Sequence, residues 1–183
     1  VVVQGTSGRG LDQGGPLPAA LAEVLGSAPL VLTDPDGTPD ADWLAELWLA
    51  ITDHGAVVVD VAPGLEAGVG ATLAASLRAL KLVVTDPDGG WGKPPRGFAD
   101  MATHSEAFVD QLGHRRDGEV AHAILFALDS GVTNVNLCRP GDVDQELFTY
   151  DGTGTLFTSG GYVELDRLRV ADLPAVERLV RQG

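Results

Sequence analysis

Short runs of aliphatic residues alternate with helical patterns along this chain, and this alternation constrains the fold most. Residues 30–32 (LVL), 56–61 (AVVVDV) and 82–84 (LVV) are almost entirely apolar, as the buried strands of a parallel sheet are. Residues 43–51 and 70–80, which lie between these runs, are expected to form helices. The strand–helix–strand–helix–strand order predicts an α/β fold with a doubly wound, mainly parallel sheet.

The first of these helices has clear start and stop signals. Asp40 or Asp42 is expected to cap its N-terminus, because a short polar side chain accepts hydrogen bonds from free N–H groups there. Gly55 is expected to end it. Four apolar residues recur at helical spacing between these signals, namely Trp43, Leu44, Leu47 and Ile51.

The rest of the chain is less regular. Residues 89–118 are rich in glycine, proline and charge, which predicts a long loop with one short helix. The segment ELFTYDGTGT, residues 146–155, is interpreted as a closing strand that breaks into two glycines. The other expected elements are a helix from Pro18 (PAALAEVLG), the short helix at 105–112, a helix at 120–128 and a strand at 132–138.

The balance of charge excludes some classes of partner. The net charge is −14, from 26 acidic and 12 basic residues, whereas binding to a nucleic-acid backbone requires clustered Lys and Arg. No apolar run approaches the roughly 20 residues that span a bilayer, and no basic segment precedes an apolar signal segment. We therefore expect a cytoplasmic protein with neither nucleic acid nor membrane as a partner. The single cysteine, Cys138, is expected to be a small buried hydrophobic residue.

Two glycine-containing motifs are candidates for phosphate binding. VVVQGTSGRG at the N-terminus is a strand followed by a glycine-rich loop, but no helix signal follows at once, so a surface loop is favoured. The pentapeptide TDPDG occurs at 33–37 and again at 85–89, each time after an apolar strand. Ligands bind at that edge of open α/β sheets, although Asp-Pro-Asp-Gly is also a good turn sequence. The candidates for a nucleotide-binding remnant are Thr85, Asp86, Asp88 and Gly89.

Histidines and carboxylates gather in the irregular region without forming a metal motif. The residues concerned are His104, His114, His122, Glu106 and Asp110. Their spacing matches no compact ligand pattern such as His-x-x-x-His. We therefore predict no metal site.

The order of motifs between Trp43 and Phe157 resembles that of the amino acid kinase family. GATLAASLRAL followed by LVVTDPDGG is similar to the helix, strand and nucleotide-binding turn of these kinases, and ELFTYDGTGT is similar to the end of the fold in acetylglutamate kinases and N-acetylglutamate synthases. The resemblance implies a three-layer kinase-like domain at 1–158, shortened because most of the N-terminal lobe is missing. LDRLRVADLPAVERLV resembles the start of an N-acetyltransferase domain, so residues 162–183 are interpreted as a stub of one.

The resemblance also shows which catalytic groups are missing. Kinases of this family have a lysine in the first glycine loop, where this chain has Gln4 and no lysine, and another in the helix that aligns with GEVAHAILFAL, which has none. Glu66 is the only stand-in for the aspartate that organises those lysines. Phosphoryl transfer depends on positioned positive charge, so we predict no catalytic residues in this chain. The loop that holds the acetyl-CoA pyrophosphate is missing too, so acetyl-CoA is expected only with a complete acetyltransferase domain.

The segment 146–155 is the candidate for binding L-arginine, which the resembled synthases use as a feedback effector. Glu146 can accept two hydrogen bonds from a guanidinium, and N–H groups around Gly152 and Gly154 can meet the α-carboxylate. The family's arginine site is built partly from this segment. The alternative is a core strand in which Leu147 and Phe148 pack and the glycines form a turn.

These observations favour a degenerate, arginine-sensing regulatory domain of an N-acetylglutamate synthase, in arginine biosynthesis, that forms homo-oligomers. One alternative is an active acetylglutamate kinase-type phosphotransferase in which Lys81 or Lys93 replaces the missing lysines. Another is a non-catalytic module that acts only in oligomer assembly.

Overall fold

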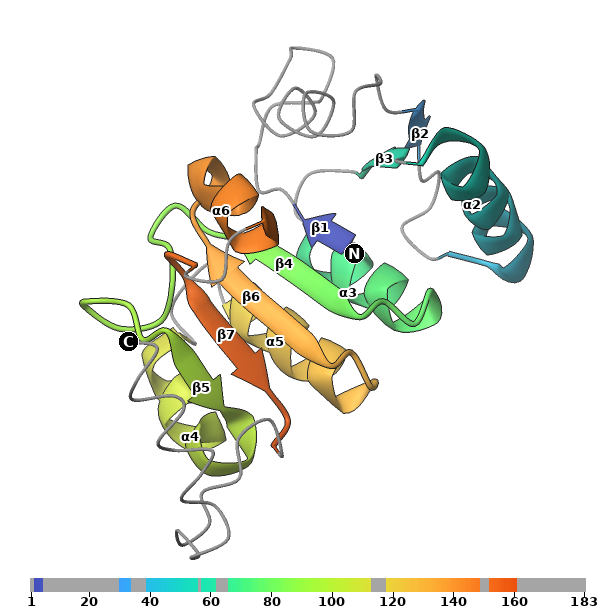
Figure 1. Ribbon diagram of the computed structural model, residues 1–183. Helices are drawn as coiled ribbons and strands as arrows, with labels where there is room; N and C mark the ends of the chain where they lie inside the picture. The colour runs from blue at the N-terminus through green and yellow to red at the C-terminus, as the bar shows by residue number, and fades with distance from the viewer. Residues whose placement is uncertain are drawn as a thin grey trace, which may run out of the picture.

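The computed structural model describes residues 2–4, 30–33, 39–55, 57–61, 66–112, 118–148 and 152–160. The centre of the described structure is a five-stranded sheet with the strand order β1-β4-β6-β7-β5 (Figure 1). Its strands are β1 (Val2–Gln4), β4 (Lys81–Thr85), β5 (Phe98–Asp100), β6 (Asn134–Cys138) and β7 (Thr155–Thr158). The predicted mainly parallel sheet is confirmed.

One pair of strands departs from the parallel arrangement. β4 pairs in parallel with β1 and with β6, and β5 pairs in parallel with β7. β6 and β7 are antiparallel, with Val135 opposite Phe157 and Leu137 opposite Thr155. The last described strand in the sequence therefore lies between β6 and β5, and it joins the edge strand to the rest of the sheet.

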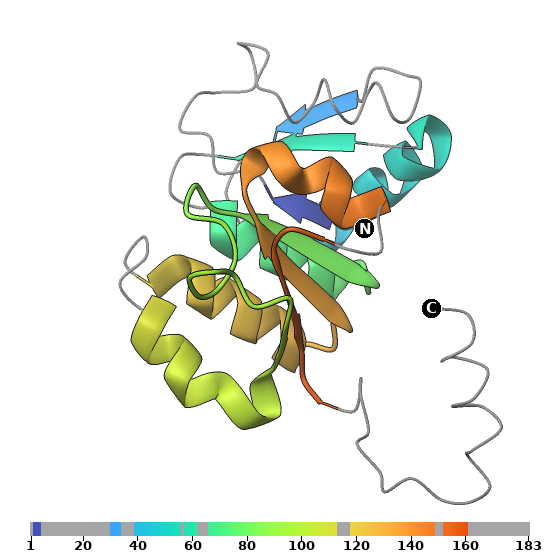
Figure 2. The same ribbon diagram turned by 60° about the vertical axis from the view of Figure 1, so that its left-hand side comes forward.

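Helices cover both faces of this sheet (Figures 1 and 2). One face carries α3 (Glu66–Ser76), α4 (Met101–Leu112) and α5 (Glu119–Asp129). The other face carries the short helix α6 (Val143–Phe148), which follows the 3₁₀ turn η3 (Pro140–Asp142). α5 runs along the middle of its face, and its residues Val120, Ile124 and Leu128 are buried there.

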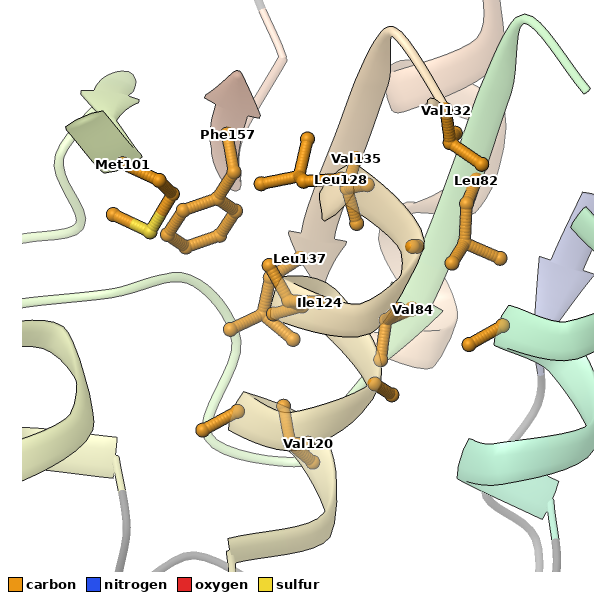
Figure 3. Packing of buried hydrophobic residues seen from close by; sticks show 14 of the residues in the cluster. Leu82, Val84, Met101, Val120, Ile124, Leu128, Val132, Val135, Leu137 and Phe157 are labelled. Atoms are coloured by element: carbon orange, nitrogen blue, oxygen red, sulfur yellow. The ribbon is translucent and has the colours of Figure 1, made fainter. Parts of the chain in front are cut away.

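The main core lies between the sheet and α5. Figure 3 shows Leu82, Val84, Val135 and Leu137 of the sheet beside the buried residues of α5. Alternate residues of the same strands point to the opposite face, where Val83 and Cys138 pack with Val143 of α6. β4 and β6 thus place apolar side chains on both faces, as is typical of a sheet between two layers of helices.

An aromatic cluster closes the β5 end of this core. Trp91 is in edge-to-face contact with Phe108 of α4, at 5.6 Å between ring centroids, and Phe108 lies 4.9 Å from Phe157 of β7. The Trp91 indole N–H donates to Gln111, and its backbone N–H donates to the hydroxyl of Thr155. The loop that follows β4 is therefore fixed to β7 and α4.

A smaller unit packs on the outer side of α3. It consists of β2 (Leu30–Thr33) paired in parallel with β3 (Val57–Asp60), and of α2 (Ala41–His54). The predicted caps of α2 are confirmed: Asp40 accepts from the N–H of Trp43 at 2.8 Å, and Gly55 has a φ of 74°. Leu47 of α2 packs with Val69 and Leu73 of α3.

The end of α3 differs from the prediction of a helix at 70–80. The helix begins at Glu66 and ends at Ser76. Arg78 adopts a left-handed φ of 50°, and the N–H groups of Arg78 and Ala79 donate to the carbonyls of Ala75 and Ala74. These contacts form a Schellman motif, which ends the helix before the apolar pattern ends at the exposed Leu80.

Three further predictions are corrected by the structure. Residues 98–100 form the strand β5 instead of a loop, and the helix expected at 105–112 begins at Met101, because the Asp100 carboxylate accepts from the N–H of Ala102. Glu146 lies in the helix α6, not in a closing strand, and only Thr155–Thr158 form a strand there. The acidic residues of the first turn of α6 favour a helix, because its N-terminus carries partial positive charge.

Some predictions fall on residues outside the described ranges. These are the glycine loop at 5–10, the helix from Pro18, most of the first TDPDG copy and the segment 162–183. Within the described ranges, no helix is long and apolar enough to cross a membrane.

Candidate functional site

Glu146 is the charged residue around which the candidate site is built. It lies in α6, which packs on β4 and β6, and its side chain is only 4% exposed. A carboxylate removed from water in this way must be satisfied by hydrogen bonds or by a positive charge. The partners of Glu146 therefore define what the site can do.

Two groups hold the carboxylate in place. Oε2 accepts from Nδ2 of Asn136 in β6, and Oε1 accepts from the backbone N–H of Gly154, both at 2.6 Å. The Glu146 main-chain carbonyl accepts from Nζ of Lys81, which begins β4. One helix, two strands and the turn before β7 thus meet at one buried acid.

The two glycines of the turn have a steric role here. A Cβ on Gly152 would lie 2.5 Å from Oε2 and 2.6 Å from Oε1 of Glu146, so the backbone of Gly152 lies directly against the carboxylate. A Cβ on Gly154 would lie within 2.2 Å of the carbonyl oxygen of Leu137. The Gly-x-Gly spacing therefore lets this turn approach both Glu146 and β6.

Asn136 leaves one acceptor available beside the carboxylate. Its side chain is buried, and its Oδ1 atom has no hydrogen-bond partner among the described residues. An unpaired buried polar atom costs free energy and is rare in native proteins, so it calls for an explanation such as a ligand or an ordered water molecule. Glu146 and Asn136 together present carboxylate and amide oxygens, which are the acceptors that a cationic group requires.

Cys138 borders the site and is an unreactive thiol. The thiol is fully buried, as predicted. Burial, with smaller contributions from the carboxylates of Glu146 and Asp142, raises its pKa from 9.0 to about 12. It therefore stays a neutral thiol at physiological pH and lacks the thiolate form that nucleophiles need.

The structure brings together the three residues predicted for effector binding, but the N–H group of Gly154 has a different partner from the one predicted. Glu146, Gly152 and Gly154 are neighbours, but the N–H of Gly154 points to the Glu146 carboxylate. Phe148, expected to pack in the alternative interpretation, is 60% exposed.

Sequence reasoning missed Asn136 and Lys81 as partners of Glu146. The available signal was a pair of asparagines in the otherwise apolar run NVNLC and a lysine at the start of an apolar strand. Neither signal indicates Glu146 as the partner, because Lys81 is 65 residues and Asn136 is 10 residues away from it in the sequence.

The second TDPDG copy forms a turn at the carboxyl end of β4, as predicted. The Asp86 carboxylate accepts from the N–H of Asp88, and its carbonyl accepts from the N–H of Gly89, whose φ is 75°. The Asp86 N–H donates to the carbonyl of Cys138 at the end of β6. Thr85 and Asp86 are buried, so this turn joins the ends of two neighbouring strands.

The other candidate residues do not converge. Lys93 lies in an exposed loop, while Lys81 is bonded to the Glu146 carbonyl. His104 bonds the carbonyl of Asp100 and contacts Trp91. Across the described ranges, no group of three or more histidine, cysteine, aspartate or glutamate side chains could hold a metal ion.

Comparison with known proteins relates this chain to amino-acid acetyltransferases. No protein-family model matches the sequence. Over 117 residues, 61% of this chain, the sequence is 31% identical to the amino-acid acetyltransferases of Neisseria meningitidis serogroups B and A. The chain shows homology to amino-acid acetyltransferases. It spans only 26% of the length of these relatives.

Solved structures with this fold include N-acetylglutamate synthase from Neisseria gonorrhoeae. The synthase complexed with coenzyme A and L-arginine has a TM-score of 0.57 and 20% sequence identity, and the match covers 88% of this chain and 47% of that one. The same synthase complexed with coenzyme A and N-acetyl-glutamate has a TM-score of 0.54 and 21% identity, over 88% and 45% of the two chains. At this identity the likeness shows a shared fold.

Proposed function

We propose that this chain is the arginine-sensing regulatory part of an N-acetylglutamate synthase, with a degenerate, three-layer amino acid kinase-like fold. Homology to amino-acid acetyltransferases and a fold shared with a synthase that was crystallised with L-arginine support this role. In this proposal the chain binds the end product of the pathway and leaves the acetyl transfer to another part of the protein.

The observation that carries the proposal is the buried Glu146 carboxylate beside Oδ1 of Asn136, which has no hydrogen-bond partner in the described part of the chain. A guanidinium presents five N–H donors in a planar fork, and it pairs best with a carboxylate and a neighbouring acceptor. Two described hydrogen bonds occupy the carboxylate, which has about four lone-pair sites, so Glu146 can accept further bonds. Arginine therefore suits this set of groups better than lysine, whose ammonium has no planar fork.

The other end of the ligand needs a positive counterpart. Lys81 lies beside Glu146. Its ammonium group has three N–H donors, and the described bond to the Glu146 carbonyl uses one of them. The exposed turn at Gly152 and Thr153 adds backbone N–H groups at the surface next to the carboxylate. These groups are the candidates for holding the α-carboxylate of arginine.

Phosphotransfer is not part of this proposal. α5, which takes the place of a kinase helix that carries a catalytic lysine, contains no lysine. Stabilising a transferring phosphoryl group requires such positioned cations. In this proposal the chain keeps a kinase-like fold without the lysines on which phosphoryl transfer depends.

Isothermal titration calorimetry tests the proposal. We expect arginine to bind, and lysine and ornithine to give no comparable heat. Glu146→Gln keeps the shape of the side chain and removes its charge, so arginine affinity should fall at least about tenfold, the loss of a charge-assisted pair. Glu106→Gln, an exposed change on α4, is the matched control and should bind arginine like the unmodified chain.

Two outcomes would contradict the assignment. One is the absence of any arginine-specific heat in a folded sample. The other is equal arginine affinity in the Glu146→Gln and Glu106→Gln variants, which would place the ligand elsewhere. A titration with ATP and acetylglutamate in the same buffer tests the kinase alternative.

A further inference from the structure

α2 carries a second apolar face that nothing in the described structure covers. Its inner face is buried against β3 and α3 through Leu47 and its neighbours. On the outer side, Ala45, Trp48, Leu49 and Thr52 follow the i, i+3, i+4, i+7 spacing of a single stripe. All four are exposed, Trp48 to 57% and Leu49 to 67%. We call these four residues the outer stripe.

The outer stripe is less polar than its composition indicates. The hydroxyl of Thr52 donates to the carbonyl of Trp48 one turn earlier, at 2.9 Å. This bond satisfies the hydroxyl within the helix and leaves the methyl group of Thr52 as its outward surface. A large aromatic ring flanked by aliphatic groups is typical of the centre of a binding surface.

The helix that carries the stripe is also well fixed. Asp40 caps its first turn, and Gly55 donates to the carbonyl of Ile51 at its end. Its inner face is held by the cluster around Leu47. The outer stripe is therefore a rigid surface that a partner can bind without first ordering it.

One margin of the stripe is acidic. Asp42, Glu46 and Asp53 lie on one line of the helix, at i, i+4 and i+11, and Leu49 lies within one or two turns of each. All three are exposed, and α2 contains no lysine or arginine. The charge beside the apolar surface is thus of a single sign.

We propose that the outer stripe binds an amphipathic helix of another protein, whose apolar face carries lysine or arginine along one edge. The apolar face of the partner would cover Trp48 and Leu49, and its basic edge would pair with the acidic margin. Two other occupants fit less well. An anionic membrane surface would be repelled by the acidic margin. A second copy of this chain has a net charge of −14, and pairing two stripes in antiparallel would place their acidic margins side by side.

Fluorescence anisotropy with two designed peptides tests the proposal. Both probes are fluorescein-labelled helices with the same leucine stripe, one flanked by lysine and the other by glutamate. We expect the lysine-flanked peptide to bind and to bind more weakly at 300 mM than at 50 mM NaCl, since exposed charge pairs are screened by salt. The glutamate-flanked peptide should not bind.

Variants of the chain then locate the contact. Trp48→Gln should weaken binding of the lysine-flanked peptide at least about tenfold, as the loss of an aromatic anchor does. Leu80→Gln removes another exposed apolar side chain, 76% exposed, outside α2 and should bind like the unmodified chain. Both positions are exposed, so thermal melts should show a retained fold, and arginine titration reports separately on the Glu146 site.

Three results would overturn the inference. The first is equal binding of the two peptides, and the second is an equal loss of binding in the Trp48→Gln and Leu80→Gln variants. The third is self-association, seen by analytical ultracentrifugation, that Trp48→Gln abolishes while the lysine-flanked peptide leaves it unchanged. That result would assign the outer stripe to a second copy of the chain.

Discussion

Replacing Gly154 with alanine should destabilise this protein far more than a single added methyl group normally does. The new Cβ would lie 2.2 Å from the carbonyl oxygen of Leu137 and 3.0 Å from Cβ of Cys138. Non-bonded heavy atoms prefer about 3.5–4.0 Å, so both contacts are repulsive. Leu137 belongs to β6, which is paired with β4 on one side and β7 on the other, so its carbonyl cannot move without disturbing two ladders.

The cost has two parts. Overpacking of this kind typically costs about 1–3 kcal/mol, and the rigid backbone obstacle favours the upper end. Moving the turn would also weaken the bond from the Gly154 N–H to Glu146, and a hydrogen bond to a charged group contributes about 1.5–3 kcal/mol. Together they predict a loss of about 3–5 kcal/mol. For a domain of this size that corresponds to a fall in Tm of roughly 6–20 °C.

Urea denaturation followed by circular dichroism measures this loss directly. Gly68→Ala is the matched control, since it adds the same methyl group within α3 where nothing lies within 4 Å. It should leave stability unchanged or raise it by about 0.5–1 kcal/mol through the better helix propensity of alanine. If Gly154→Ala and Gly68→Ala unfold at the same urea concentration, the close approach of the turn to β6 is wrong.

Three further predictions follow from single contacts. Gly152→Ala should abolish arginine binding, because its Cβ would lie against the Glu146 carboxylate. It should cost less stability than Gly154→Ala, because the obstacle is a side chain instead of a backbone carbonyl; calorimetry showing full affinity would contradict this. The pKa of Cys138 is raised from 9.0 to about 12, so the neutral thiol contributes stability that is fully present below about pH 9. This contribution falls by up to about 1.4 kcal/mol per pH unit as the pH rises toward 12. The urea midpoints of Cys138→Ala should lack this pH dependence, and identical pH slopes in the two proteins would refute it. Asp40→Ala should cost about 1 kcal/mol in thermal melts by removing the cap on α2, and an unchanged Tm would exclude that cap.

The elements that the sequence predicts well are those whose signals are local. α2 has its cap, its apolar spacing and its terminal glycine within sixteen residues, and the structure has all three in place. The sequence predicts the strands β3, β4 and β6 because a short, largely apolar run can be recognised without knowledge of its partner strand. The predicted end of a helix was wrong where the backbone conformation determined it, as at Arg78 with its positive φ after α3.

The candidate site could be predicted only in part, because its contacts are between distant segments. The motif at 146–155 indicates Glu146 and the glycines, but not that Glu146 lies in a helix and faces Asn136. α6 has six residues, too few for helical periodicity to distinguish it from a strand. β5 was missed for the same reason, since three residues paired with β7 leave no local pattern.

The position of β7 has a consequence for how the chain reaches its fold. β5 and α4 are synthesised well before β7, yet in the five-stranded sheet β5 pairs only with β7. Until residues 155–158 leave the ribosome, β1, β4 and β6 can associate, while β5 has an unsatisfied edge and Phe108 lacks Phe157. The growing chain must therefore keep this edge from pairing with other chains until one short strand, β7, completes the sheet.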